Sequence, residues 1–273
     1  MESNMKIIRH TYQAYPYHMV STSPWPILVS FSLLSLMLGG VMYMHGYTYG
    51  NYLLELGFLL TILGITFWLK DIIIEGTYIG DHTKEVQRGI VIAIILFIIS
   101  EIFVFLSVFW AFFHSSLSSS ISIGGVWPPA GIITIDAFSI PLINTLLLLS
   151  SGAFITYGHH ALMEGNRSQA IWGTILTLLF GLIFTALQYY EYIDCTFSMS
   201  DSIYGTVFYA STGLHGIHVI MGTLAIFMGL VRLCNYQLTD AHHQGHEAGI
   251  TYWHFVDVVW LFLFASVYFW SGI

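Results

Sequence analysis

The chain has 273 residues, of which 56% are hydrophobic and only 8% are charged; its net charge is −8 and its mean hydropathy is +0.74. Soluble domains carry about 25% charged residues, so this composition excludes an ordinary soluble globular protein. With so few basic residues there is no patch of the kind that binds nucleic acid, and no nucleic-acid partner is expected.

Seven apolar segments are long enough to cross a bilayer as helices, which takes about 20 residues. They cover residues 25–44, 52–69, 89–114, 140–157, 170–190, 203–231 and 250–271. Their hydropathy does not alternate as it does in barrel strands, so they predict an all-α membrane protein with seven transmembrane helices. Residues 1–24 then form an N-terminal tail, 25–70 the first two helices, 71–88 a polar loop and 89–273 a five-helix bundle.

The basic residues predict the orientation. All of them fall in the tail or in the loops after the second, fourth and sixth spans: Lys6, Arg9, Lys70, Lys84, Arg88, Arg167 and Arg232. These segments share one side of the membrane, which the positive-inside rule makes the cytoplasm or the mitochondrial matrix. The N-terminus is therefore expected on that side and the C-terminus on the other.

Glu101 is a lone carboxylate in the apolar sequence "LFIISEIFVF" of the third span. The uncharged run extends twelve residues to either side, which places Glu101 roughly 18 Å from each end of a helix and near mid-membrane. An ionised acid is costly there, so its side chain is expected to be protonated or hydrogen bonded. His215 and His218 lie at the same depth in the sixth span, and one of them is the predicted partner.

Glu101 can be interpreted as part of a proton relay or as a neutral polar link between helices. A relay needs a chain of polar groups that reaches water. The sequence offers one acid and two histidines at this depth and no continuous series. The neutral link is therefore the favoured interpretation, and no catalytic residue is assigned.

The thirteen histidines include groups that resemble the histidine boxes of membrane di-iron oxygenases. The groups are "HH" at 159–160, "HGIH" at 215–218 and "HHQGH" at 242–246. The first and last lie at the inner face, while the middle group lies about 15–20 Å away along the helix axis. One metal site cannot span that separation, so no metal site is expected.

Four further polar residues are candidates for lipid binding or for proton entry at the inner face. Asp257 lies about two turns inside the seventh span, with His254 three residues earlier as its natural partner. Arg232 ends the sixth span, where it could hold a lipid phosphate or the last carbonyls of its own helix. His82 lies in the polar loop 71–88. Glu164 and Arg167 are expected to form an ion pair.

Several long stretches resemble the family of subunit 3 of mitochondrial cytochrome c oxidase. They are "YHMVSTSPWP", "ILFIISE", "FWAFFHSSL", "GGVWPP", "HHALMEGNR" and "EAGITYWHFVDVVWLFLFASVYFW". The resemblance runs from about Tyr17 to the C-terminus. One departure is His246, where the family pattern leads us to expect an aromatic residue.

The resemblance implies a helix pair and a five-helix bundle that enclose a cleft filled with phospholipids, in the mitochondrial inner membrane. It implies that haem a and copper belong to partner subunits, with no cofactor in this chain. It further implies packing on the catalytic subunit 1 and other oxidase subunits, support of proton uptake, and membership of respiratory supercomplexes. Glu101 matches the family's buried glutamate of the third helix.

The alternative is a stand-alone proton-coupled transporter. That class tends to show inverted repeats and helices broken by Gly or Pro at the midplane, and neither is visible here. A di-iron oxygenase ranks third because of the different depths of the histidines.

Overall fold

The computed structural model describes residues 15–240 and 242–272. Seven helices are long and apolar enough to cross a membrane, and no strand occurs in this part of the chain. The predicted fold class, an all-α membrane protein with seven transmembrane helices, is confirmed. The helices are α2 (Trp25–Met44), α3 (Gly50–Ile74), α4 (Lys84–Leu117), α5 (Ile140–Met163), α6 (Arg167–Asp194), α7 (Ile203–Cys234) and α8 (Gln244–Leu263). Of the predicted tail, residues 1–14, with Lys6 and Arg9, lie outside the described residues, and residues 15–24 form no helix.

Most helices extend beyond the predicted spans. The predicted loop 71–88 is therefore wrong, because the observed loop is much shorter. α3 runs to Ile74 and continues as the π-helical turn Glu75–Ile79, and α4 already begins at Lys84. Only residues 80–83 lie between these helical segments. The uncharged runs mark the hydrocarbon-facing part of each helix, but backbone hydrogen bonds continue into the interface because Lys, Glu and Gln are good helix formers.

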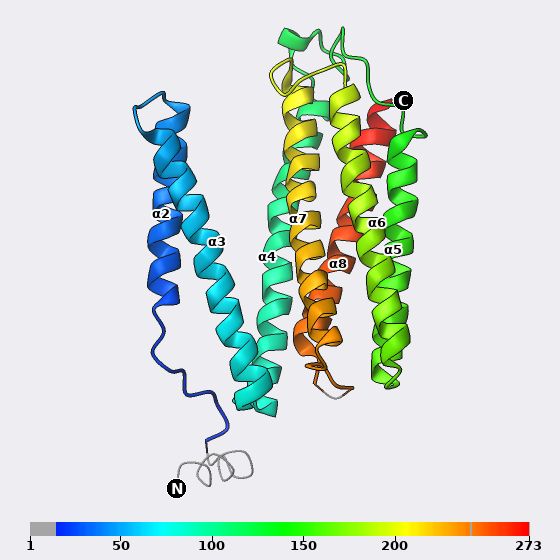
Figure 1. Ribbon diagram of the computed structural model, residues 1–273. Coiled ribbons are helices and arrows are strands. Elements are labelled where there is room, and N and C mark those ends of the chain that lie inside the picture. Colours follow the sequence, from blue (N-terminus) through cyan, green and yellow to red (C-terminus); the bar gives the residue numbers. More distant parts are fainter. Residues whose placement is uncertain (1–14, 241, 273) are drawn as a thin grey trace, which may run out of the picture. The chain divides into compact units, whose positions relative to one another are not determined.

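Contacts divide the chain into two units, residues 1–90 and 91–273. This grouping agrees with the expected helix pair and five-helix bundle; the lipid-filled cleft stays a prediction. In the first unit α2 and α3 pack side by side (Figure 1). Glycine permits this, since a Cβ on Gly39 would lie 2.6 Å from Cα of Leu54, and one on Gly57 would lie 2.5 Å from the backbone nitrogen of Leu36.

The second unit is a bundle in which α5 packs on α6, α6 on α7, and α8 on both α5 and α7 (Figure 1). α5 and α6 meet at Gly158 and Gly173, where a Cβ on the second glycine would lie 2.7 Å from Cα of the first. Polar bonds also tie α8 to α5. The indole of the fully buried Trp253 donates to the Ser151 hydroxyl at 2.9 Å.

α4 joins the bundle differently, through large aromatic side chains. Phe105 contacts the rings of His218 and Phe255, at centroid distances of 4.9 and 5.9 Å. Phe109 meets Phe262 at 6.3 Å. Along its 34 residues α4 buries only Phe105, Phe112 and Ser116. Most of the helix is left for contact with lipid or protein.

Candidate functional site

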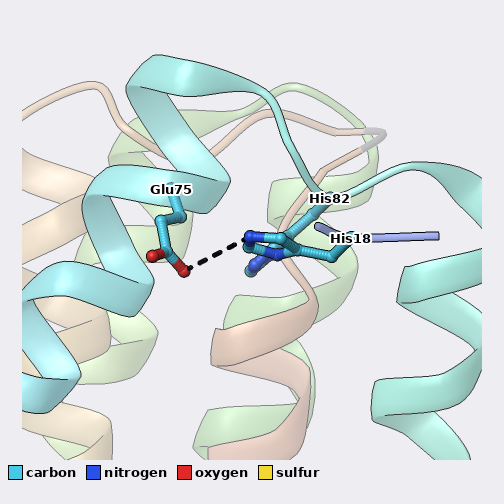
Figure 2. Close-up of side chains that lie close together, drawn as sticks. All are labelled: His18, Glu75 and His82. Atoms are coloured by element: carbon cyan, nitrogen blue, oxygen red, sulfur yellow. Dashed lines mark ion pairs between the residues drawn. The ribbon is translucent and has the colours of Figure 1, made fainter. Parts of the chain in front are cut away.

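His82 lies beside two other potential ligand residues in the first unit. Figure 2 shows His18, from the segment before α2, Glu75, at the end of α3, and His82, from the turn before α4. His18 Nε2 lies 4.0 Å from Glu75 Oε2 and 4.0 Å from Asp81 Oδ2. The two imidazole rings are 5.9 Å apart. This group was not predicted from the sequence, because His18 lies far from Glu75 and His82 along the chain.

Glu101 makes the predicted contact with a histidine of the sixth span, and the partner is His218. Glu101 Oε2 lies 2.8 Å from His218 Nε2. The side chains keep only 19% and 8% of their surface exposed, respectively. Phe105 covers one edge of the imidazole, and the ring of Tyr252 is stacked over it at 6.2 Å. The pair therefore links α4 to α7 inside an aromatic enclosure.

The hydrogen bonds of His218 determine how many protons the pair holds. Nδ1 lies 2.8 Å from the carbonyl oxygen of Leu214, which can only accept, so Nδ1 carries a proton. Nε2 and the Glu101 carboxyl then share one further proton. Either a carboxylic acid donates to neutral imidazole, or imidazolium donates to carboxylate. In both arrangements the pair carries no net charge, so no uncompensated charge is buried at this depth.

His215, the other candidate partner, faces α8 instead. Its Nε2 lies 3.3 Å from the carbonyl oxygen of Val256, to which it donates. The side chain is 1% exposed and contacts the rings of Phe184 and Trp260. One helical turn thus separates a histidine that binds the acid from one that fixes α7 to α8.

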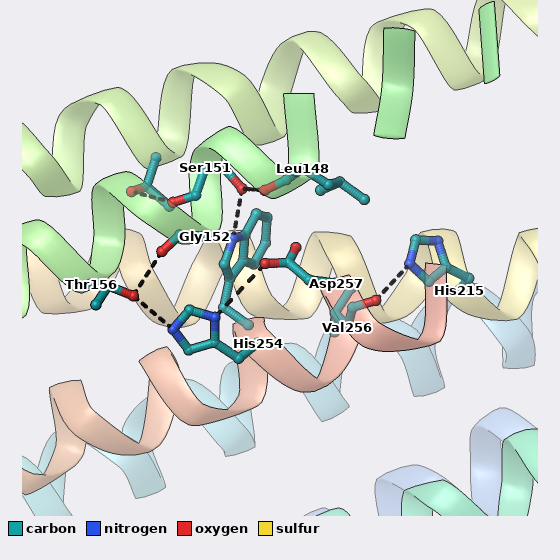
Figure 3. Close-up of polar contacts among 10 residues, drawn as sticks. Leu148, Ser151, Gly152, Thr156, His215, His254, Val256 and Asp257 are labelled. Carbon is teal, nitrogen blue, oxygen red and sulfur yellow. Dashed lines mark hydrogen bonds and ion pairs between the residues drawn. The ribbon is translucent and has the colours of Figure 1, made fainter. Parts of the chain in front are cut away.

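Asp257 and His254 lie together with Thr156 of α5 (Figure 3). The Thr156 hydroxyl donates to the Gly152 carbonyl at 2.8 Å, so it accepts from His254 Nε2 at 3.2 Å. In neutral His254 this leaves the lone pair on Nδ1, which faces Asp257 Oδ2 at 3.9 Å. This separation is longer than a hydrogen bond, so Asp257 and His254 are neighbours without being directly bonded.

The Asp257 carboxyl is buried, whereas His254 is half-exposed, with 8% and 43% of the side-chain surface accessible. Oδ2 occupies the space where a side chain on Gly152 would be, 2.6 Å from the Cβ position. Oδ1 has no hydrogen-bond partner among the described residues. An exposed imidazole beside a buried carboxyl can pass a proton inward, although the present separation would first have to shorten.

Arg232 lies in the last turn of α7, and its guanidinium is directed toward Gly245 at the start of α8. The last carbonyls of α7 are bound by Arg167 of α6, which donates to Leu233 at 3.1 Å and to Cys234 at 2.8 Å. Its guanidinium also covers the ring of Tyr236 at 3.6 Å. The predicted ion pair between Glu164 and Arg167 is therefore wrong for the described chain, because neighbouring carbonyls meet the arginine with better geometry.

The histidine groups at the predicted inner face meet in one direct contact. His159 Nε2 lies 3.1 Å from His243 Nε2, and His243 Nδ1 donates to the Thr239 carbonyl at 2.9 Å. His159 is consequently the donor within the pair. His246, the departure from the family pattern, is 3% exposed, and its ring fills the space left by the missing side chain of Gly229.

A further buried acid, Glu191 of α6, was not identified from the sequence. It is 3% exposed, and its Oε1 accepts from the Tyr268 hydroxyl at 2.7 Å and from Gln188 at 3.2 Å. The sequence "QYYEYID" looks like an interfacial helix end because it ends in a second acid. The one available signal was Gln188, three residues before Glu191 on the same helical face.

An apolar groove of about 730 Å³ lies along α4 and α8, and Ile102, next to Glu101, is one of its lining residues. Phe105, Phe255 and Phe262 are among the others. The one hydroxyl group in the lining, on Ser266, already donates to the Phe262 carbonyl. The lining of the groove is therefore almost entirely apolar and suits contact with hydrocarbon.

Comparison with known proteins gives matches over almost the whole chain. The family described as cytochrome c oxidase subunit III matches residues 15–272. Cytochrome c oxidase subunit 3 of Schizophyllum commune is 58% identical over 261 residues, covering 96% of this chain and 97% of that protein. The proteins of the same name from Mycosarcoma maydis and Rhizopus stolonifer are each 52% identical, covering 98% of this chain and 100% and 95% of their own lengths.

Proposed function

Because the chain belongs to the cytochrome c oxidase subunit III family, we propose that it is a non-catalytic core subunit of cytochrome c oxidase, respiratory complex IV. That enzyme transfers electrons from cytochrome c to oxygen and pumps protons. The chain packs on catalytic subunit 1 and contacts the other oxidase subunits. Haem a and copper reside in those partners. The complex lies in the mitochondrial inner membrane and joins respiratory supercomplexes, with the N-terminus of this chain in the matrix and its C-terminus in the intermembrane space.

The hydrogen bond between Glu101 and His218 is the structural observation that best supports a non-catalytic role. Both ring nitrogens of His218 are engaged: Nε2 by the Glu101 carboxyl, and Nδ1 by the Leu214 carbonyl of its own helix. A carrier that moved protons through this pair would need a second polar partner for one of them. The geometry supports a neutral link that holds α4 on the bundle.

Phospholipid binding follows from the surface of α4 and α8. The groove along these helices has an apolar lining that suits an acyl chain, and Glu101, next in sequence to its lining residue Ile102, is hydrogen bonded to His218. Arg232, in the last turn of α7, is the proposed contact for a polar headgroup.

Support of proton uptake is proposed for Asp257 and His254. The half-exposed imidazole faces the buried carboxyl at 3.9 Å. With the N-terminus in the matrix, α8 begins at the matrix face, and His254 and Asp257 lie in its third and fourth turns. Protons collected by His254 could then be delivered toward a partner subunit.

Purification through a tag on this chain tests the proposal. Membranes are solubilised gently, and the visible spectrum of the eluate is recorded together with its oxygen consumption on reduced cytochrome c. We expect haem a and oxidase activity to co-purify. A colourless protein that drives proton-coupled transport after reconstitution would support the stand-alone transporter and reject the subunit.

A further inference from the structure

We propose that His18, Glu75 and His82 form a binding site for a divalent transition-metal ion of the zinc type. The site lies wholly within the first unit, residues 1–90, and is independent of the proposed oxidase function. Each residue offers one ligand atom, and the three atoms all lie within 4.8 Å of one another (Figure 2). No metal site was expected from the sequence, because the histidine groups of the later spans lie at different depths.

The donor set has the chemistry of a zinc site. Two imidazoles and one carboxylate are common protein ligands of zinc, with a water as the fourth ligand. Ligand atoms of a tetrahedral site lie about 3.3 Å apart, given bonds of about 2.0–2.1 Å. The three atoms must therefore close by about 1.5 Å at most, which small changes of side-chain torsion angles achieve.

The distances between His18 and the nearby carboxylates favour a metal ion bound between them over an ordinary ion pair. His18 Nε2 stands 4.0 Å from both the Glu75 and the Asp81 carboxylates, too far for a hydrogen bond to either. At these distances His18 gains little stabilisation from an ion pair with either carboxylate. Asp81 is positioned to neutralise the remaining charge of the ion or to hold its water.

The backbone around the cluster brings these residues together. The Thr83 hydroxyl donates to the carbonyl of Pro16 and so fixes the segment that carries His18 beside the turn that carries His82. Gln87 donates to the His82 carbonyl at 2.9 Å. Gly76 makes room for the imidazole, since a Cβ there would lie 2.7 Å from His82 Nδ1.

The π-helical turn Glu75–Ile79 places the carboxylate. Gly80 follows this turn and has a left-handed backbone conformation, with φ +75°. The backbone N–H of Asp81 donates a hydrogen bond to the Glu75 carbonyl at 3.1 Å. Single π turns occur frequently at functional sites. A bound ion would tie the segment before α2 to the end of α3.

The test titrates the purified full chain in detergent with Co²⁺, whose visible bands report four-coordinate nitrogen and oxygen ligands, and then displaces it with Zn²⁺. We expect one site in the wild type, and at least about tenfold weaker binding in His82→Asn and Glu75→Gln, because even outer-shell partners are worth about 10–100-fold. His82→Asp, which keeps a ligand, should retain binding with a shifted spectrum.

His243→Asn is the matched control, since it removes one member of the other histidine contact, and it should leave the cobalt spectrum unchanged. Far-UV circular dichroism verifies that each variant is folded. Equal cobalt binding in the wild type and in folded His82→Asn would overturn the proposal, and so would loss of the signal in His243→Asn with retention in His82→Asn.

Discussion

The bond between Glu101 and His218 predicts a measurable coupling between α4 and α7. In Glu101→Leu, His218 Nε2 loses its partner inside an aromatic enclosure, and in His218→Leu the carboxyl loses its partner. An unpaired buried polar group costs about 1–3 kcal/mol, so each single substitution should lower the free energy of unfolding by that amount. The double substitution leaves neither group unpaired and should cost less than the sum.

The expected coupling is about 1–2 kcal/mol. Interhelical hydrogen bonds in membrane proteins average about 0.6 kcal/mol and reach about 1.7 kcal/mol. This pair belongs at the upper end because the two groups share a proton and can form a charge-assisted bond. The assay is unfolding of the full chain in mixed micelles with increasing SDS, followed by far-UV circular dichroism, for the wild type and the three variants.

Ser100 provides the matched control, because it adjoins Glu101 but bonds the Phe97 carbonyl of its own helix. Ser100→Ala combined with His218→Leu should be additive. A coupling between Glu101 and His218 that is no larger than this control value would refute the link that we derive between α4 and the bundle.

Three destabilising substitutions and one matched control test the packing within the two units, again by SDS unfolding. Gly39→Ala should destabilise the first unit by about 1–3 kcal/mol, because its Cβ would lie 2.6 Å from an α3 backbone atom; Gly40→Ala, with only an ordinary contact at 3.9 Å, should be neutral or stabilising. Arg167→Met removes two donors from the end of α7 and should cost about 1 kcal/mol. Tyr268→Phe deprives buried Glu191 of its shortest hydrogen bond and should cost about 1–3 kcal/mol. Unchanged unfolding in any of the three destabilising variants would contradict the corresponding contact.

Much of the fold could be predicted from apolar runs, and the errors have one cause. Charged residues mark where a helix leaves the hydrocarbon, but they do not end it. Lys70 and Asp71 lie within α3, and Lys84, Glu85 and Arg88 begin α4. A polar stretch that seems to be a loop by hydropathy is therefore mostly helical, and only the four residues 80–83 make the turn.

For Glu101, the depth of the residues in the membrane was enough to predict two candidate partners. Counting residues from the ends of two spans placed Glu101 level with His215 and His218. Depth could not choose between them, since that depends on the rotation of α7 about its axis. The cluster around His82 depends on how a segment before α2 folds back to the end of α3, and Glu191 on its burial at a helix end; neither leaves a periodic signal in the sequence.

The most direct test of the central claim is the turnover of an oxidase complex carrying Glu101→Gln. The amide can donate to the lone pair on His218 Nε2 and keep the link between α4 and α7. We predict assembled complex with oxygen consumption and proton pumping within about twofold of the wild type, since the amide keeps one hydrogen bond between the two helices and the net difference between the two bonds is under about 1 kcal/mol. Loss of turnover or of pumping in a fully assembled complex would show that Glu101 must titrate, and would contradict its role as a neutral link.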